Sequence, residues 1–473
     1  MSNENQKLGL TERVCYGFGD LASCLFWMTI TFYLLFFYTD VFGISAAAAG
    51  IMIGVSRFLD AMFDVVIGLL ADRTSTRWGK FRPYIMWGAL PLAISAVLAF
   101  TTPSFGGPAK IVYAYVTFVF FMFLYSAVNI PYTSLLGVIS GDPIERTSTS
   151  SFKFVGAYLG GFVVSATALP LVKYFGHGVD TKGWQATLAA YGVSSIILFA
   201  ITFMMTKERI RPIAKEKTPL KDDLKDIVNN VPWMVLFAAT ILFILFVCIR
   251  LSVTAHYFKY FIGEQTFSFF AGPKKYGFET LASVFNTIGQ SCSLVGVLIV
   301  PWFAKLVGRK RALVILMLVS LFSTGIFYFF KPDNLWLIFT FQAIGSLAGG
   351  PISALLWVLY ADTADYSEWK TGRRATGLVF SASIMSNKIG WTVGTLIAGL
   401  ILAGTGFVPN IVQNLDVKNG LRAMMSVIPL GAGILTLVIL AFFYKLDEPL
   451  MAKVKSELDA RRNSLENAAK SEA

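Results

Sequence analysis

Long apolar runs separated by short polar connections extend along almost the whole chain. Each run holds about 20 or more residues, the length at which a helix crosses a hydrocarbon core of about 30 Å. The pattern therefore predicts about twelve membrane-spanning helices. They are expected at residues 15–39, 46–71, 83–102, 110–138, 150–175 and 186–205, and then at 232–262, 279–304, 311–330, 335–361, 375–404 and 420–444.

A polar stretch between the sixth and seventh predicted spans indicates two halves. Gly- and Arg-rich tight turns follow the second span, at 68–82, and the eighth, at 305–311, and we interpret the match as an internal repeat. The fold class is then an all-α membrane protein of twelve transmembrane helices in two six-helix pseudo-repeats, with the solute site between them. The expected segments are an N-terminal six-helix bundle at 1–205, a linker at 206–231, a C-terminal six-helix bundle at 232–444 and a tail at 445–473 that includes a short amphipathic helix.

Composition and charge favour a membrane protein over a nucleic-acid-binding one. Only 14% of the 473 residues are charged, against about 25% in soluble domains. The net charge is +12, but the basic residues gather in alternate connections and no nucleic-acid motif accompanies them. By the positive-inside rule, this asymmetry places both termini and the linker of a multi-pass membrane protein in the cytoplasm. The four cysteines lie in apolar segments without metal-ligand spacing.

The second predicted span contains ionisable residues that are costly inside a membrane. Arg57, Asp60 and Asp64 are spaced so that they share one helical face. Two carboxylates one turn apart repel each other, and a bound cation or proton would relieve the repulsion, with Arg57 expected to pair with Asp60. We interpret Asp60 and Asp64 as a site for a coupling ion, H⁺ or Na⁺. A salt-bridged structural cluster is the alternative.

Other polar and aromatic residues at similar depth are candidates for solute binding. Aromatic faces stack on sugar rings, and Asn, Asp, Lys and Arg side chains bind hydroxyl groups. Packing or lipid-facing roles are the alternative for the aromatic residues. The candidates are Asp20, Trp27, Tyr125, Asn129, Lys153, Arg250, Trp357 and Lys388.

Acidic residues at the inner end of the tenth predicted span face the basic turns of neighbouring connections. We interpret them as one side of a cytoplasmic gate of breakable ion pairs, and a solvated loop is the alternative. The gate candidates are Arg73, Arg82, Arg146, Asp362, Asp365 and Arg373.

Six short motifs, in this order, resemble the glycoside–pentoside–hexuronide:cation symporters, the melibiose-carrier branch of the major facilitator superfamily. The resemblance runs from about residue 16 to 445 and implies the major facilitator fold, alternating access, and sugar uptake coupled to Na⁺, Li⁺ or H⁺. The motifs lie at 16–20, 38–40, 60–64, 77–83, 129–132 and 361–366.

The resemblance also assigns roles to individual positions. Asp60 and Asp64 match the cation-site acids of the family. Tyr125 and Lys388 match positions that line its cavity, and Lys153 falls where an Arg contacts sugar in melibiose carriers. The implied ligands are a small-molecule sugar and the lipid bilayer, with no cofactor other than the coupling ion, and we expect a monomer.

Three positions depart from the melibiose-carrier pattern. Cys24 and Asn129 stand where melibiose carriers have sugar-binding acids, which argues against a galactoside. Basic residues near mid-depth outnumber acidic ones, which favours an acidic sugar such as a hexuronide, since unpaired buried cations are unfavourable. Phe63 replaces a polar residue beside the second cation-site acid, so H⁺ coupling is at least as well supported as Na⁺ coupling.

Two rival functions remain open from the sequence. Membrane prenyltransferases also carry two Asp-rich segments, which hold Mg²⁺ and a pyrophosphate, but both segments are needed on one side of the membrane with further acids. A facilitative channel would need a pore loop, and no signal for one is present. We expect a transporter, not an enzyme.

Overall fold

The computed structural model is nearly all-helical, and it describes residues 8–74, 76–104, 106–140, 143–209, 230–268, 273–371, 376–454, 456–458 and 460. The helices before the predicted linker are α1 (Leu10–Phe36) with its π-helical continuation η2 (Phe37–Val41), α2 (Ala46–Arg73), α3 (Arg82–Ala99), α4 (Gly107–Leu135), α5 (Pro143–Gly176) and α6 (Asp180–Met205). Those after it are α8 (Val231–His256) with the π-helix η3 (Tyr257–Ile262), α9 (Phe278–Val307), α10 (Arg309–Gly325) with the 3₁₀ turn η4 (Ile326–Phe329), α11 (Leu335–Thr371), α12 (Thr376–Gly404), α13 (Leu415–Met425), α14 (Val427–Val438) and the π-helix η5 (Ile439–Phe443). Residues 448–454 of the tail are also helical.

Eleven helical segments of the described chain are long and apolar enough to cross a membrane. The helix α2 is not among them, although its 28 residues give it sufficient length. Its apolar surface points outward, because Phe58, Met62 and Val66 are each at least half exposed, whereas Arg57 and Asp60 are each only 5% exposed. A helix that buries its charges and exposes its apolar side chains is suited to lipid on one face and to a polar interior on the other.

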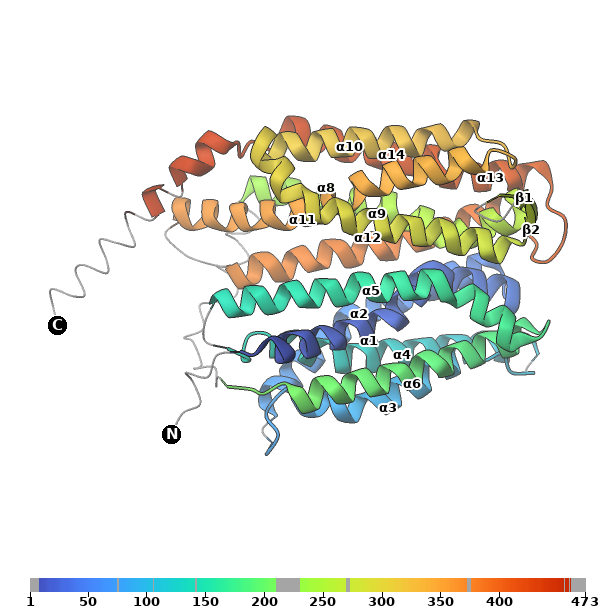
Figure 1. The fold of residues 1–473 in the computed structure, drawn as a ribbon, viewed down its shortest axis with the longest axis horizontal. Coiled ribbons are helices and arrows are strands. Elements are labelled where there is room, and N and C mark those ends of the chain that lie inside the picture. The colour runs from blue at the N-terminus through green and yellow to red at the C-terminus, as the bar shows by residue number, and fades with distance from the viewer. Residues whose placement is uncertain are drawn as a thin grey trace.

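The helices form two groups that lie side by side along their length (Figure 1). Helices α1 to α6 make the N-terminal group and α8 to α14 make the C-terminal group. The start of α1 and the helical residues 448–454 of the tail lie at one end of the molecule, which we call the terminal end, and a small hairpin marks the other, which we call the hairpin end. The groups meet mainly through α2 against α12, α5 against α9, and α1 against α8.

The hairpin is the one departure from the all-α expectation in the described residues. The aromatic-rich connection before α9 contains two antiparallel strands, β1 (Gln265–Phe267) and β2 (Lys274–Tyr276). An ion pair of 2.6 Å between Lys275 Nζ and Glu264 Oε2 joins the two sides of the hairpin. The centre of the Phe267 ring lies 4.9 Å from that of Trp336. Segments this short escape detection by hydrophobic periodicity, which needs a longer window.

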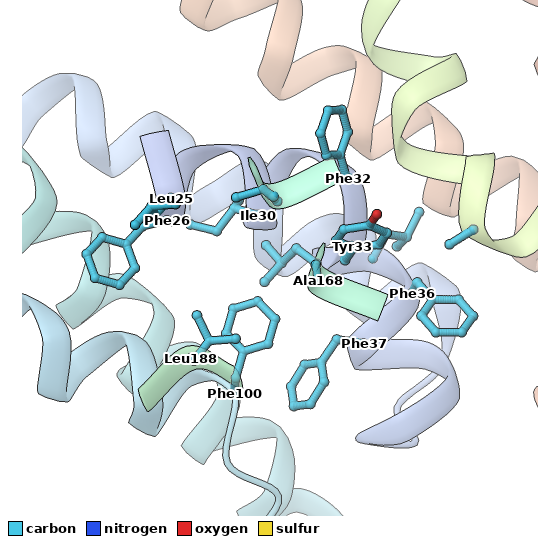
Figure 2. Close-up of a cluster of buried hydrophobic side chains, with 14 of the residues drawn as sticks. Leu25, Phe26, Ile30, Phe32, Tyr33, Phe36, Phe37, Phe100, Ala168 and Leu188 are labelled. Carbon is cyan, nitrogen blue, oxygen red and sulfur yellow. The ribbon is translucent and has the colours of Figure 1, made fainter. Parts of the chain in front are cut away.

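Aromatic packing forms the core of the N-terminal group. Phe26 and Phe37 of α1 and η2 lie among Phe100, Ala168 and Leu188, contributed by three other segments (Figure 2). Phe37 stacks within 4.7 Å of Phe100, centroid to centroid. Phe32 differs, because its ring points away from this core toward the helices of the C-terminal group (Figure 2).

Glycines allow close approach of helix backbones within the N-terminal group and between the two groups. A Cβ atom on Gly156 of α5 would lie 2.1 Å from the carbonyl oxygen of Gly17 in α1. Between the groups, a Cβ atom on Gly399 of α12 would lie 2.8 Å from Cα of Gly50 in α2. Small residues at such crossings are the usual means of helix association in a membrane.

We predict that Gly156→Ala destabilises the protein by about 1–3 kcal/mol, because the added methyl group must displace backbone. Gly68→Ala in α2 is the matched control, since a Cβ atom there would meet nothing within 4 Å. The control should be neutral or stabilising by up to about 1 kcal/mol through helix propensity. Thermal unfolding in detergent measures the stability of both variants. A Gly156→Ala protein as stable as the Gly68→Ala protein would show that close packing of α1 on α5 does not limit the stability of the fold.

Candidate functional site

An acidic cluster lies where the two helix groups meet at mid-depth. Lys388 Nζ of α12 donates to Asp60 Oδ2 of α2 at 2.8 Å and also to Asp64 Oδ2. The hydroxyl of Ser126 on α4 contacts Asp60 Oδ1 at 2.6 Å and Asp64 Oδ1 at 2.8 Å. The two carboxylates predicted as a cation site therefore share one ammonium and one hydroxyl, and the ammonium comes from the opposite group.

The expected ion pair between Arg57 and Asp60 is wrong. The Arg57 guanidinium lies 4.8 Å from the ring centre of Trp27 and 5.6 Å from that of Trp391. No ion pair within 4.0 Å joins it to Asp60 in the described structure. Arg57 is held by two aromatic faces instead, an arrangement that suits its flat and weakly hydrated cation.

Aromatic candidates of the N-terminal group line the same region. Trp27 and Tyr125 stack with ring centres 5.5 Å apart, and the Arg57 guanidinium also lies over the Trp27 ring. Asn129 follows Tyr125 by one turn of α4 and is half-buried. Phe63 packs edge-to-face on Phe123 at 5.3 Å, and it adds no oxygen to the acidic cluster.

A second set of candidates lies toward the terminal end of α1. Lys153 Nζ lies 3.4 Å from the Thr133 hydroxyl and 5.6 Å from the centre of the Tyr132 ring. The charges of Lys153 and Asp20 interact electrostatically. These residues and Trp27 all belong to α1, α4 and α5, so the N-terminal group supplies most of the predicted solute contacts.

Two predicted contacts lie elsewhere in the C-terminal group. Arg250 of α8 lines a separate cavity together with Gln342 of α11. Trp357 lies beside a much smaller void shared with Tyr360 and Asn387. The sequence could not separate these residues from the acidic cluster, because depth in the membrane does not specify which helices surround a side chain.

Two of the predicted gate residues are engaged within their own groups, and a third lies outside the described residues. Arg309 Nη1 pairs with Asp362 Oδ2 at 2.6 Å, and Arg82 donates to the carbonyl of Phe203. No ion pair joins Arg73, Arg82 or Arg146 to Asp362 or Asp365 where all five are described. The side chain of Arg373 lies outside the described residues.

A buried polar network at the hairpin end was not anticipated. Asp40 of η2, whose side chain is fully buried, accepts from Lys259 Nζ of η3 at 2.8 Å and from the Tyr260 hydroxyl. His256 Nε2 lies 3.3 Å from Asp40 Oδ2, and Asn410 Nδ2 donates to the Asp40 carbonyl at 2.8 Å. We call these residues, Asp40, His256, Lys259, Tyr260 and Asn410, the hairpin-end latch, since they join the two groups.

Two signals in the sequence could have pointed to this latch. Asp40 ends the second of the short motifs, at residues 38–40, and His256 is one of only two histidines in the chain. The structure adds that η2 and η3 are both π-helical extensions of long helices. Such π-helical turns are frequent at functional sites.

The oxygens of the acidic cluster offer part of a site for a hard cation. Two carboxylates and the Ser126 hydroxyl converge on one position, and oxygen ligands suit Na⁺. The Lys388 ammonium supplies the positive charge in the described structure. Among the described residues, no group of three or more His, Cys, Asp or Glu side chains is arranged to hold a metal ion.

Comparison with known proteins gives consistent matches along almost the whole chain. The family described as "MFS/sugar transport protein" matches residues 15–448. An isoprimeverose transporter of Lactiplantibacillus pentosus is 37% identical, over 96% of this chain and 93% of its own length. The protein named "Putative glycoside/cation symporter YagG" of Escherichia coli is 33% identical, over 96% of each chain. A solved bacterial homologue of the human drug peptide transporters superposes with a TM-score of 0.68 at 13% identity, over 94% of this chain and 99% of its own.

We predict that Lys388→Met destabilises the protein by up to about 3–5 kcal/mol, because it leaves two neighbouring carboxylates without a cation. Lys153→Met is the matched control, since the nearest hydrogen-bonding partner of its ammonium is a hydroxyl at 3.4 Å. Adding Asp60→Asn to Lys388→Met should restore part of the loss. Thermal unfolding in detergent measures the three variants, and equal melting temperatures for the two lysine variants would contradict the prediction.

Proposed function

Because the chain belongs to the MFS/sugar transport protein family, we propose that it is a secondary active transporter that moves a sugar together with a cation by alternating access. The chain is a multi-pass membrane transporter, and its family and relatives are transporters and not enzymes. The prenyltransferase alternative is therefore set aside. The remaining questions are how the cation and the sugar are coupled and which of each is used.

The bridge from Lys388 to Asp60 and Asp64 is the observation that supports coupling most directly. The ammonium of one helix group occupies the place that a coupling cation or proton would take between the acids of the other. Binding of that ion releases Lys388, and the contact that holds the groups together at mid-depth is lost. Binding of the ion and movement of the groups are thereby linked through one set of charges.

The distribution of contacts between the groups supports an alternating-access cycle. In the described residues, the ion pairs between the groups lie at the acidic cluster or toward the hairpin end, where Asp40 contacts Lys259 and Lys173 pairs with Glu279 at 3.6 Å. In our proposal, this state is closed at the hairpin end. With both termini cytoplasmic, as the basic connections indicate, the site would open to the cytoplasm. The gate of Arg73, Arg82, Arg146, Asp362, Asp365 and Arg373 would form in the opposite state.

We assign α2 as the twelfth span, beside the eleven apolar ones. The two helix groups would then be the six-helix bundles at 1–205 and 232–444 in a bacterial inner membrane. The matched π-helical ends of α1 and α8 support a repeat relation between the groups. In this arrangement the acidic cluster lies between the repeats near mid-depth, where transporters of this kind place their sites.

The solute in this proposal is a glycoside, a pentoside or a hexuronide. Trp27 and Tyr125, which stack on each other, supply aromatic side chains for contact with a sugar, and Asn129, Asp20 and Lys153 offer hydrogen bonds to its hydroxyl groups. Because a relative is named as an isoprimeverose transporter, isoprimeverose is the first neutral sugar to test. The excess of basic residues at mid-depth keeps acidic sugars in the proposal.

We predict that Asp60→Asn and Asp64→Asn each abolish concentrative sugar uptake while the protein stays folded. Each variant keeps a single carboxylate, which Lys388 neutralises, so the excess negative charge that would attract the ion is lost. Uptake of labelled sugar into energised cells is the measurement, with Asp416→Asn, on the exposed first turn of α13, as the matched control. Normal sugar accumulation in either acid variant would show that the substituted residue takes no part in coupling. If cells with the unmodified protein never accumulate sugar above its external concentration, the protein would instead be a channel.

We predict that the coupling ion is H⁺. Phe63 contributes no oxygen to the cluster, and a proton needs only one of the two carboxylates, whereas Na⁺ needs a shell of oxygens. Adding the sugar to de-energised cells should therefore make the medium more alkaline. Sodium-dependent uptake without a pH change would contradict H⁺ coupling and leave the transport function intact.

A further inference from the structure

A cavity of about 170 Å³, with both apolar and polar lining residues, lies inside the C-terminal group, apart from the acidic cluster. Residues of α8, α9, α10 and α11 line it, and Phe32 of α1 closes it toward the N-terminal group. Figure 2 shows this ring turned away from its own core toward the C-terminal helices. By the same measure a single water needs about 10–15 Å³, so the cavity has room for a small ligand.

Arg250 projects into this cavity without an acidic partner among the described residues. Its Nη1 donates to the Thr324 hydroxyl at 3.0 Å and its Nη2 to Gln342 Oε1 at 3.3 Å, both neutral acceptors. Its Nε is buried and has no hydrogen-bond partner. A guanidinium carries five N–H donors in a fork that matches a carboxylate. The side chain thus has unused capacity for an anion.

The other basic residues expected at mid-depth are already engaged. Lys388 is shared between the two acids, Arg57 lies against two indole rings, and Lys153 interacts with Asp20 and a hydroxyl. Arg250 meets neutral partners, namely the Thr324 hydroxyl, the Gln342 amide oxygen and the Phe327 ring 4.8 Å from its guanidinium carbon, and it also lines an open cavity. An uncompensated charge away from bulk water is unfavourable unless a ligand pairs with it.

The remaining walls of the cavity suit hydroxyl groups. Asn286 Oδ1 is buried without a hydrogen-bond partner, and Gln290 and Ser320 also line the space. Gln290 packs against Gly161 of α5, so the cavity borders the contact between the two groups. Movement of the groups could therefore open it to the main solute path.

We propose that this cavity binds the acidic group and adjacent hydroxyls of a sugar acid, and that Arg250 makes the transporter prefer acidic over neutral sugars. The inference rests on the proposed sugar transport. The carboxylate replaces neutral acceptors around Arg250 with a charged one, and charge-assisted hydrogen bonds are about twice as strong as neutral ones. Asn286 and Gln290 then select for hydroxyls beside the acid.

The test compares methyl β-glucuronide with methyl β-glucoside, which differ only at the acid, by titration calorimetry on the purified full chain. The unmodified protein should bind the glucuronide about tenfold or more tightly, as expected for one charge-assisted contact. Arg250→Gln should remove that preference and leave glucoside affinity within about threefold. Lys153→Gln is the matched control, and it should weaken both ligands without changing their ratio.

Two further variants locate the effect and guard against misfolding. Gly349→Ala adds a methyl group at ordinary contact distance, 3.5 Å from the Ser320 hydroxyl, and it should weaken glucuronide binding by reducing the cavity. Arg250→Lys keeps the positive charge but loses the forked N–H donors of the guanidinium. If Arg250→Gln does not fold, this variant tests whether Arg250 causes the preference for the glucuronide. It should retain less than half of the preference.

Equal affinities for the two ligands in the unmodified protein, or a preference that survives Arg250→Gln, would overturn the inference. Cation-coupled uptake of isoprimeverose by cells that express the same protein would then still support the proposed transport. Failure of every sugar to accumulate would instead count against the transport function itself. The two failures are therefore distinguishable.

Discussion

The need to compensate buried charge is the constraint on which the rest of this structure depends. Asp60 and Asp64 lie one helical turn apart in a segment surrounded by apolar helices, and only Lys388 from the opposite group balances them in the described state. The same requirement explains why α2 turns Phe58 and Met62 outward and its charges inward. Electrostatics at this one point therefore sets both the orientation of α2 and its contact with α12.

A second set of buried charges acts at the hairpin end. Asp40 is fully enclosed and is satisfied by Lys259, Tyr260 and His256 from the C-terminal group. Breaking such a pair without replacing a partner is costly, while exchanging one partner for another costs much less. A transporter can change conformation at a moderate cost in free energy when each buried charged group exchanges its partner for another, such as an ion, a water molecule or a second side chain. The latch and the acidic cluster are the two places where this exchange is needed.

Several features were accessible from residue order alone. Hydrophobic periodicity placed the long helices, and the spacing of Asp60 and Asp64 placed both on one face of α2, because both features depend only on neighbours along one helix. The partner of Asp60 was mispredicted as Arg57, three residues away, since local spacing favours a local pair. The structure instead selects Lys388, 328 residues along the chain from Asp60.

The sequence by itself thus determined that this protein lies in a membrane, where its long helices fall along the chain, and which acids demand compensation. Those properties follow from the cost of placing polar groups in hydrocarbon, which each segment meets independently. Only the tertiary structure decided which charge compensates which acid, that Asp40 and Lys259 join the two groups, and that Arg250 faces a separate cavity. Such pairings depend on distances of a few ångströms between helices far apart in the chain, because hydrogen bonds form only at those distances and ion pairs are strongest there.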